Sequence, residues 1–202
     1  MKIICIARNY VEHAKELNNE IPENPVFFLK PDTALLQKNR DFYIPEFTQD
    51  LHYEAEIVLK ISKAGKYIQT EFAQNYFQEI SLGIDFTARD LQNQLKKKGH
   101  PWEIAKAFDN SAVIGDFFDK NEFDLNNLNF RLDKNEETVQ QGNTQQMIHD
   151  FSKIIAEASK YFTLKTGDLI MTGTPAGVGK VNIDDRLKGW IENQLAFDIS
   201  VK

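Results

Sequence analysis

Apolar residues recur along this chain in two patterns, and the pattern of a β-strand predominates. Side chains alternate between the two faces of an extended strand, so short apolar runs bounded by Gly, Pro, Asn or Asp predict strands. The chain is therefore expected to be rich in β-structure. The strands are expected at residues 2–7, 26–31, 51–61 and 80–85, in a meander between 112 and 142, before the glycine-rich stretch 173–179, and at 186–201 with a turn near Glu192-Asn193.

Helical spacing is confined to a few shorter segments. Asn9 is expected to cap the first of them. Thr87 and Asp90 predict an approximate capping box for another, which Gly99 ends. Asp150 precedes an amphipathic helix that is expected to pack on a sheet. The helical segments are expected at residues 10–17, 70–77, 87–98 and from 151 to about 162.

Composition and charge narrow the class of protein. The 202 residues are 42% hydrophobic and include 15 Phe, enough for one globular domain, residues 1–202, with a thick core or an oligomer interface. The net charge of −6 and the absence of any like-charge block longer than 96–98 argue against nucleic-acid binding. The apolar run at the N-terminus is too short for a signal peptide, and no span suits a membrane helix. The single cysteine, Cys5, fits a reducing compartment, so a cytoplasmic protein is expected.

Two acidic side chains share one face of the strand expected at 51–61. Glu54 and Glu56 are two residues apart, so both point the same way, and Asp85 closes the strand expected at 80–85. Like charges on one face repel unless a divalent cation, a pair of basic side chains or bulk water separates them. If a cation does so, an all-carboxylate set suits Mg²⁺ or Mn²⁺ and suits Zn²⁺ poorly.

Several other polar side chains are candidates for chemistry. His13 and Glu16 are three residues apart and lie on one helix face, which is either a solvated face or an acid–base pair. Lys30 ends an apolar strand, either as a surface residue or as a cation facing a ligand. Lys106 lies among small apolar residues and is a candidate for a partly desolvated amine. The polar stretch 18–24 is expected to be a loop, and such a loop beside a site is a natural lid.

The stretches after Asp85 and after residue 172 add possible ligand contacts. Arg89 and Gln92 are three apart and can face one site, or Arg89 can pair with an acidic neighbour. The glycine-rich stretch 173–179 fails the spacing of both the phosphate-binding loop and the dinucleotide fingerprint. Its backbone N–H groups and the Thr174 hydroxyl could instead hold a small anion such as a carboxylate.

Six motifs occur in a fixed order along the chain: Arg8-Asn9-Tyr10-x-x-His13-x-x-Glu16, Phe28-Leu29-Lys30-Pro31, Tyr53-Glu54-x-Glu56, Asp85-x-Thr87-Ala88-Arg89-Asp90-x-Gln92, Gly99-x-Pro101-Trp102-x-x-x-Lys106-x-Phe108 and Thr172-Gly173-Thr174-Pro175-x-Gly177-Val178-Gly179. Together they resemble the fumarylacetoacetate hydrolase family, in its small single-domain branch of acylpyruvases and oxaloacetate decarboxylases. The resemblance runs from Arg8 to the closing strands. The chain departs from the family's usual residues at Ala7, at Gln145-Gln146 and at residues 107–110. The departure at 107–110 could alter the shape of the substrate that the site accepts.

The resemblance implies a mixed β-sandwich or roll with a few covering helices, acting as a homodimer with one Mg²⁺ or Mn²⁺ site per chain. It implies that the metal holds a 2-oxo acid and bears the charge of an enolate. The positions that match the family are Glu54, Glu56 and Asp85 as metal ligands, His13 and Glu16 as the pair that prepares the hydrolytic water, Lys106 as the group that stabilises oxyanion or enolate charge, Arg89, Gln92 and Thr174 as substrate-binding residues, and Lys30 with a less certain role in substrate binding.

The expected activity is the Mg²⁺-dependent hydrolysis of acylpyruvates, such as acetylpyruvate or fumarylpyruvate, to pyruvate and a carboxylic acid, with oxaloacetate decarboxylation in the same site. One alternative is an isomerase and decarboxylase acting on 2-hydroxyhepta-2,4-diene-1,7-dioate. Another is a non-catalytic β-domain that binds a cation or a small carboxylate. The presence of His13, Glu16 and Lys106 beside the three carboxylates argues against this last alternative, since a cation site needs no base.

Overall fold

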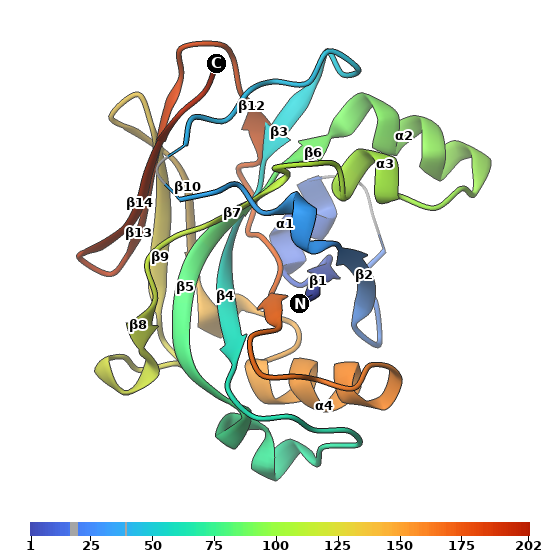
Figure 1. Cartoon of the computed structure of the whole chain (residues 1–202), viewed down its shortest axis with the longest axis vertical. Helices are drawn as coiled ribbons and strands as arrows, with labels where there is room; N and C mark the ends of the chain where they lie inside the picture. The colour runs from blue at the N-terminus through green and yellow to red at the C-terminus, as the bar shows by residue number, and fades with distance from the viewer. Residues whose placement is uncertain (17–19, 39) are drawn as a thin grey trace.

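A curved, mixed seven-stranded sheet lies at the centre of the fold (Figure 1). The computed structural model describes residues 1–16, 20–38 and 40–202. The spatial order is β2-β1-β11-β4-β5-β7, and β8 also pairs with β5. Strands β1 and β11 run parallel, whereas β2, β4, β5 and β7 run antiparallel to their neighbours. The strands are β1 (Ile3–Ala7), β2 (Val26–Lys30), β4 (Ala55–Ile61), β5 (Phe77–Asp85), β7 (Ala112–Ile114), β8 (Phe118–Asp119) and β11 (Leu169–Met171).

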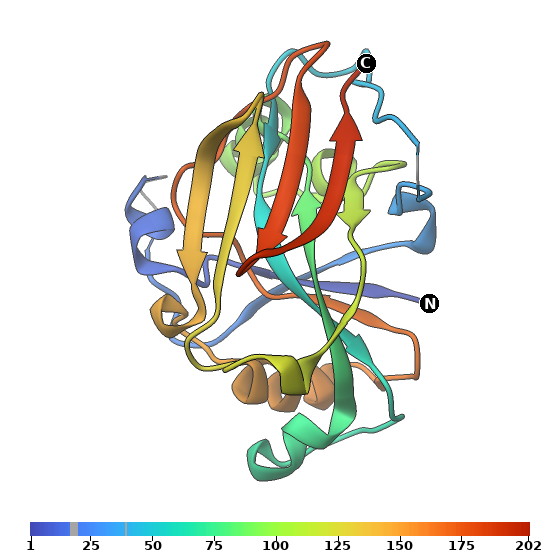
Figure 2. The same ribbon diagram turned by 90° about the vertical axis from the view of Figure 1, so that its left-hand side faces the viewer.

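A four-stranded antiparallel sheet packs against the central sheet, and Figure 2 shows it in front of β4 and β5. Its order is β10-β9-β13-β14. The turn predicted near Glu192-Asn193 is confirmed, because Glu192 has φ 47° between β13 and β14. Asn135 and Glu136 likewise have positive φ (52° and 68°) at the turn between β9 and β10. A three-stranded sheet has the order β12-β3-β6. These strands are β3 (Leu51–Tyr53), β6 (Thr87–Ala88), β9 (Asn129–Lys134), β10 (Glu137–Asn143), β12 (Gly179–Lys180), β13 (Arg186–Ile191) and β14 (Gln194–Ser200).

The helices lie around the sheets. Asp150 caps α4 as predicted, because its carboxylate accepts a hydrogen bond from the Lys153 backbone N–H at 2.7 Å. Gly99 ends α2 in the left-handed conformation with φ 64°. No helix among the described residues is long and apolar enough to span a membrane. The helices are α1 (Val11–Glu16), α2 (Arg89–Lys98), α3 (Glu103–Lys106) and α4 (Phe151–Tyr161), with 3-10 turns at Asp32–Ala34, Thr70–Tyr76, Lys120–Glu122 and Thr144–Gln146.

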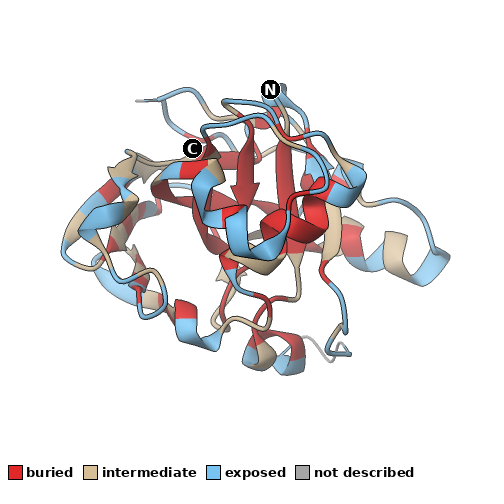
Figure 3. Ribbon diagram, turned by 90° about the horizontal axis from the view of Figure 1, so that it is seen from below, coloured by how far each residue is buried: buried red, intermediate tan, exposed pale blue. Residues whose placement is uncertain are grey.

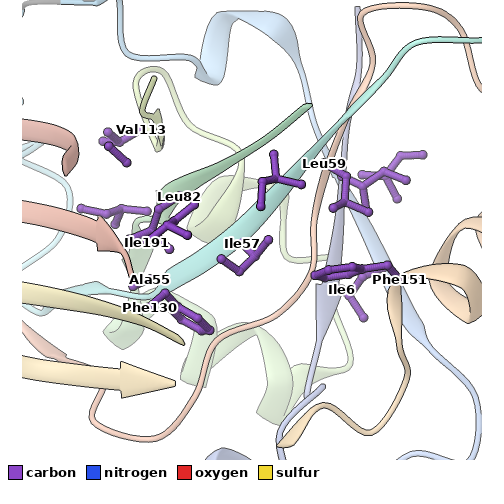
Figure 4. Packing of buried hydrophobic residues seen from close by; sticks show 14 of the residues in the cluster. Ile6, Ala55, Ile57, Leu59, Leu82, Val113, Phe130, Phe151 and Ile191 are labelled. Carbon is purple, nitrogen blue, oxygen red and sulfur yellow. The ribbon is translucent and has the colours of Figure 1, made fainter. Parts of the chain in front are cut away.

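The hydrophobic core fills the space between the two larger sheets and reaches under α4 (Figures 3 and 4). Strand β4 shows the predicted alternation. Ala55, Ile57 and Leu59 join the large cluster, whereas Val58 packs with Cys5 in a second cluster on the other face. The face that carries Val58 also carries the acidic side chains, so the strand buries apolar residues on one side and builds a polar site on the other.

The strand expected to be continuous over 51–61 is broken at Glu54. Strand β3 pairs with β6 and β12, whereas β4 pairs with β5 and β11. The Glu54 carbonyl accepts a hydrogen bond from the Asp85 backbone N–H at 2.8 Å. The break therefore lets the chain pass from one sheet to another at the point where the acidic residues meet. Residues 18 and 19 of the loop predicted at 18–24 lie outside the described residues.

The capping box predicted for α2 is wrong. Thr87 lies in β6, and its hydroxyl accepts a hydrogen bond from Lys106 Nζ at 2.6 Å. The Asp90 carboxylate accepts from the Thr48 hydroxyl at 2.6 Å and from the Gln49 backbone N–H at 2.9 Å. Both side chains are held by residues distant in the sequence, and these contacts replace the local cap.

Candidate active site

Three buried carboxylates meet where β3, β4 and β5 come together. Strands β4 and β5 pair with Glu56 opposite Gly83, and this register places Asp85 beside Glu54. One oxygen from each of Glu54, Glu56 and Asp85 lies within 4.8 Å of the others, and all three residues are buried. The structure thus brings together the three side chains that the sequence predicted as metal ligands.

Three cations lie against this cluster. Lys106 Nζ is 2.8 Å from Glu54 Oε2 and 2.5 Å from Asp85 Oδ2. Arg89 forms an ion pair with Glu54 as well. Lys30 Nζ lies 2.8 Å from Asp85 Oδ1. The formal charges of the three carboxylates and the three cations therefore cancel, although the pairs are unevenly distributed.

Because the ion pairs involve Glu54 and Asp85, Glu56 is the carboxylate whose negative charge is least compensated by neighbouring cations. Burial alone would raise the pKa of Glu54, but Lys106 and Arg89 together hold it well below its usual range. Burial and the neighbouring Asp85 raise the pKa of Glu56 well above its ordinary value. Burial would lower the pKa of Lys106, but Asp85 and Glu54 raise it, so Lys106 keeps its proton.

The donor set fits a hard divalent cation. The Glu56 carboxylate accepts a hydrogen bond from the Gly173 backbone N–H at 2.8 Å, and no cation pairs with it among the described residues. A buried, uncompensated carboxylate beside two others is a strong site for positive charge. Because all three side chains offer carboxylate oxygens, Glu54, Glu56 and Asp85 suit Mg²⁺ or Mn²⁺.

The predicted acid–base pair lies on α1 at the same pocket. His13 Nδ1 is 3.2 Å from Glu16 Oε2, so the spacing of three residues brings the two side chains together as predicted. Glu16 Oε1 accepts a hydrogen bond from the Gly177 backbone N–H at 3.0 Å. The buried His13 side chain lines the pocket, whereas Glu16 is exposed and lies outside the pocket lining. Glu16 therefore connects the helix to the glycine-rich loop and orients the imidazole.

One polar pocket contains most of the predicted site. Arg89 and Gln92 lie on α2, where an Arg89 guanidinium N–H donates to Gln92 Oε1 at 2.7 Å, and both line the pocket. Thr174 lines it from the glycine-rich loop. The residues lining the pocket are Ile6, Ala7, Arg8, His13, Phe28, Glu54, Glu56, Asp85, Arg89, Gln92, Lys96, Trp102, Lys106 and Thr174.

Lys30 occupies a different position from the one expected of a substrate-binding residue. Its side chain is fully buried and lies outside the pocket lining. Besides its ion pair with Asp85, Lys30 Nζ donates to the Ser111 hydroxyl at 3.0 Å and to the Lys106 carbonyl. The structure therefore gives Lys30 contacts that position Asp85 and the end of α3, and no contact surface for a ligand.

Comparison with known proteins identifies the family. The sequence model of the protein family described as the fumarylacetoacetate hydrolase C-terminal domain matches residues 2–197 of this chain. The chain belongs to this family. It is 40% identical over 188 residues to the oxaloacetate tautomerase YcgM of Escherichia coli, covering 92% of this chain and 86% of that protein. It is also 40% identical, in an alignment 206 residues long, to the mitochondrial oxaloacetate decarboxylase of Dictyostelium discoideum, and this alignment covers 100% of this chain and 94% of that protein.

A solved structure of the family has the same fold and a ligand. The fumarylpyruvate hydrolase of Pseudomonas aeruginosa, solved in complex with Mn²⁺ and pyruvate, superposes with a TM-score of 0.93. It is 34% identical, and the match covers 100% of this chain and 89% of that one. The predicted β-rich α+β sandwich with covering helices is therefore confirmed for this member of the family.

Sequence reasoning missed a side chain that connects the two larger sheets at the site. Gln140 on β10 is buried, and its amide donates to the Thr174 hydroxyl at 2.9 Å and to the Pro175 carbonyl at 3.1 Å. Its Oε1 accepts from the Ala55 backbone N–H at 2.9 Å. The residue lies in a polar strand, Glu137–Asn143, with no local signal that distinguishes it. Only the packing of one sheet on the other shows its role.

Asn9 was predicted as the cap of α1, and that prediction is wrong. Its amide donates to the carbonyls of His149 at 2.9 Å and Thr172 at 2.8 Å, and its Oδ1 accepts from the His149 backbone N–H at 2.8 Å. Gly173 packs so closely that an added Cβ would lie 2.6 Å from Asn9 Cβ. The fully buried Asn9 thus joins the end of β1 to the end of β11, beside the site.

Replacing Asn9 by alanine is expected to lower the free energy of unfolding by about 2–4 kcal/mol, because two carbonyls and one N–H are left buried without partners. Urea denaturation followed by circular dichroism measures the change. Asn126→Ala, at an exposed turn residue, serves as the control and is expected to stay within about 0.5 kcal/mol of the natural protein. Equal effects of the two substitutions would show that the Asn9 hydrogen bonds contribute little.

Proposed function

We propose that this chain is a Mg²⁺- or Mn²⁺-dependent enzyme that hydrolyses the C–C bond of acylpyruvates and also decarboxylates oxaloacetate. The proposal rests on one observation above all: a buried set of three carboxylates and the imidazole of His13, which pairs with Glu16, line the same pocket. The names of the relatives support it, since they include an oxaloacetate tautomerase, an oxaloacetate decarboxylase and a fumarylpyruvate hydrolase.

Glu54, Glu56 and Asp85 would hold the cation. When bound, a divalent cation supplies Lewis-acid polarisation of a carbonyl oxygen and stabilises negative charge that develops beside it. The chain's own groups supply binding, orientation and proton transfer.

Arg89, Gln92 and Thr174 are the proposed contacts for the carboxylate and keto oxygens of the substrate. The Arg89 guanidinium is planar and suits a carboxylate, and the Gln92 amide beside it offers a further donor. Lys106 stays protonated between Glu54 and Asp85 and lies 5.1 Å from the centre of the Phe28 ring. Its ammonium is therefore placed to stabilise the enolate charge that forms when the C–C bond breaks.

His13 is the proposed general base of hydrolysis. It takes a proton from the water that attacks the distal carbonyl, and Glu16 stabilises the imidazolium that results. Decarboxylation forms the same enolate but needs no attacking water. The two reactions therefore share the carboxylates and Lys106 and differ in their need for His13.

A second candidate, the keto–enol tautomerisation of oxaloacetate, is favoured by the name of the Escherichia coli relative. It requires one proton to move between carbon and oxygen with no C–C bond broken. The polar pocket with one base, His13, and a protonated Lys106 is compatible with this reaction also.

A substrate panel with defined Mg²⁺ tests the proposed function. We expect acetylpyruvate or fumarylpyruvate to lose enol absorbance and yield pyruvate, and oxaloacetate to release CO₂, with both rates abolished by a chelator and restored by Mg²⁺ or Mn²⁺. Enol loss from oxaloacetate without pyruvate would identify the tautomerase. Turnover of 2-hydroxyhepta-2,4-diene-1,7-dioate alone would favour the isomerase alternative, and no turnover of any substrate would favour a binding domain.

Three expectations from the sequence stay predictions. A homodimer is expected from the family resemblance, and sedimentation equilibrium measures it. The cytoplasmic location and the organisation of residues 1–202 as a single catalytic domain likewise stay predictions, which fractionation and limited proteolysis address.

A further inference from the structure

Two cations of the pocket belong to neither the carboxylate cluster nor the proposed acid–base pair. Lys96 lies on α2 four residues after Gln92 and seven after Arg89, so it continues the same helix face. Arg8 follows β1 in the left-handed conformation, with φ 59°, which is uncommon for a residue other than glycine. Both side chains line the pocket together with Trp102.

These two cations lack the partners that the others have. Lys30, Arg89 and Lys106 each pair with a buried carboxylate. Within residues 1–16, 20–38 and 40–202, no carboxylate lies at ion-pairing distance from Lys96 or Arg8. An ammonium and a guanidinium that line one pocket, neither of them paired with a carboxylate of the described residues, form a site that favours a negatively charged ligand.

An aromatic wall lies beside them. Lys96 Nζ is 5.5 Å from the centre of the Trp102 ring. The rings of Phe28 and Trp102 are 6.2 Å apart and tilted by 59°. The centre of the Phe28 ring also lies 5.1 Å from Lys106 Nζ, so aromatic surface extends from the carboxylate cluster to Lys96. A short carbon chain with an acidic group at each end would have polar partners at both ends and apolar contacts between them.

We propose that Lys96 and Arg8 form a subsite for a second carboxylate, so that the pocket selects 2-oxo dicarboxylic acids over 2-oxo monocarboxylic acids. This inference rests on the proposed function, because it assumes that the first carboxylate and the keto group occupy the end near Arg89 and Gln92. Phe28 and Trp102 would contact the carbons between the two acidic ends.

The charge of the pocket supports a dianionic ligand. The three carboxylates and the cations Lys30, Arg89 and Lys106 cancel formally. Arg8 and Lys96 add two positive charges, and the divalent cation that the carboxylates suit would add two more. A ligand with two carboxylates compensates this excess better than a ligand with one.

Isothermal titration with chain-matched ligands tests the subsite independently of catalysis. The probes are 2-oxoglutarate and 2-oxopentanoate, which share the 2-oxo acid end and differ in the distal carboxylate, each titrated in the presence of Mg²⁺. We expect the natural protein to prefer 2-oxoglutarate. Lys96→Met is expected to reduce that preference by about 10-fold to 100-fold, the range for losing a charge-assisted hydrogen bond.

Two further variants separate a binding role from a structural one. Lys96→Arg keeps a cation in place and is expected to retain the preference. Lys97→Met removes an exposed lysine from the next position of α2 and is expected to leave both affinities unchanged. If Lys96→Met weakened the binding of both ligands equally, or if the variant still preferred 2-oxoglutarate as the natural protein does, the subsite assignment would be wrong.

Failure of the subsite assignment can be distinguished from failure of the proposed function. If no acylpyruvate or oxaloacetate turns over, the enzyme assignment fails, while the titration still reports whether the distal carboxylate is recognised. If turnover occurs, the ratio of kcat/KM for fumarylpyruvate to that for acetylpyruvate should fall in Lys96→Met by the same factor as the binding preference. An unchanged ratio would contradict the subsite even in an active enzyme.

The pH dependence of the preference is a second readout. Burial, with the neighbouring Arg89 and Arg8, lowers the pKa of Lys96 to about 8, while Glu54 acts in the opposite direction and Lys106 adds to the lowering. Because the ammonium is lost as the pH rises through this value, the affinity for 2-oxoglutarate should fall between pH 7 and pH 9, approaching tenfold per unit above the pKa. The Lys96→Arg variant should not show this fall, since a guanidinium stays charged.

Discussion

Replacing Glu56 by glutamine is expected to abolish acylpyruvate hydrolysis and oxaloacetate decarboxylation together. The amide keeps the size of the side chain and can still accept the hydrogen bond from the Gly173 N–H, so the change is one of charge. Removing an outer-shell partner of a metal ligand already lowers metal affinity by about 10- to 100-fold, so losing the ligand itself should weaken Mg²⁺ binding by at least about 100-fold. Steady-state rates at increasing Mg²⁺ measure the effect on both substrates.

The same substitution is expected to stabilise the metal-free protein at neutral pH. The ordinary pKa of glutamate is 4.5, and burial and Asp85 raise the pKa of Glu56 above it in the folded chain. The folded state therefore disfavours the charged form of Glu56 at pH 7, which lowers the free energy of unfolding. Glutamine carries no charge and avoids this loss of stability. The advantage of the variant should shrink as the pH falls toward 4.5, because the glutamate then gains a proton in the unfolded chain as well.

Thermal unfolding with and without Mg²⁺ combines the two effects in one measurement. A ligand that binds only the folded state raises the melting temperature, so Mg²⁺ should stabilise the natural protein and not Glu56→Gln. Glu79→Gln serves as the control, because Glu79 is a half-exposed carboxylate on β5 that pairs with Lys60 at 2.7 Å. A Glu56→Gln enzyme that kept its full rate after chelator treatment would overturn the metal assignment.

Local spacing in the sequence was sufficient wherever one strand or one helix turn brought the residues together. Alternation of the extended chain from Glu54 into β4 placed Glu54 and Glu56 on one face, although Glu54 itself lies at the break between β3 and β4. The spacing of three residues paired His13 with Glu16 and Arg89 with Gln92. In each case the periodicity of the backbone alone fixes the neighbours.

Contacts between distant segments were not predictable in the same way. Thr87 followed the pattern of a helix cap, yet its hydroxyl meets Lys106, which α3 brings across the site. Lys30 could be read as a surface residue or a ligand-facing cation, but the pairing of β2 with β1 and the loop after α3 bury it against Asp85. Gln140 belongs to the other sheet altogether. Such partners depend on the packing of whole elements, which short patterns do not encode.

Replacing His13 by alanine is expected to suppress acylpyruvate hydrolysis by about 10² to 10⁴, the range for losing a positioned acid–base group. Oxaloacetate decarboxylation should fall by less than about tenfold, because it uses the carboxylates and Lys106 without an attacking water. The two rates are measured on one preparation with saturating Mg²⁺. Lys15→Ala, an exposed change on the same helix, controls for disturbance of α1 and should leave both rates near those of the natural enzyme.

Glu16→Gln then tests whether Glu16 acts on His13 by orienting the imidazole or by its negative charge. Glutamine can still accept the hydrogen bond from the Gly177 N–H, but it cannot stabilise an imidazolium as a carboxylate does. Hydrolysis should therefore fall by less than in His13→Ala, with decarboxylation again little affected. Equal losses of the two activities in His13→Ala would contradict the role of His13 as water activator, because a residue needed equally by both reactions must act on the shared enolate rather than on the water.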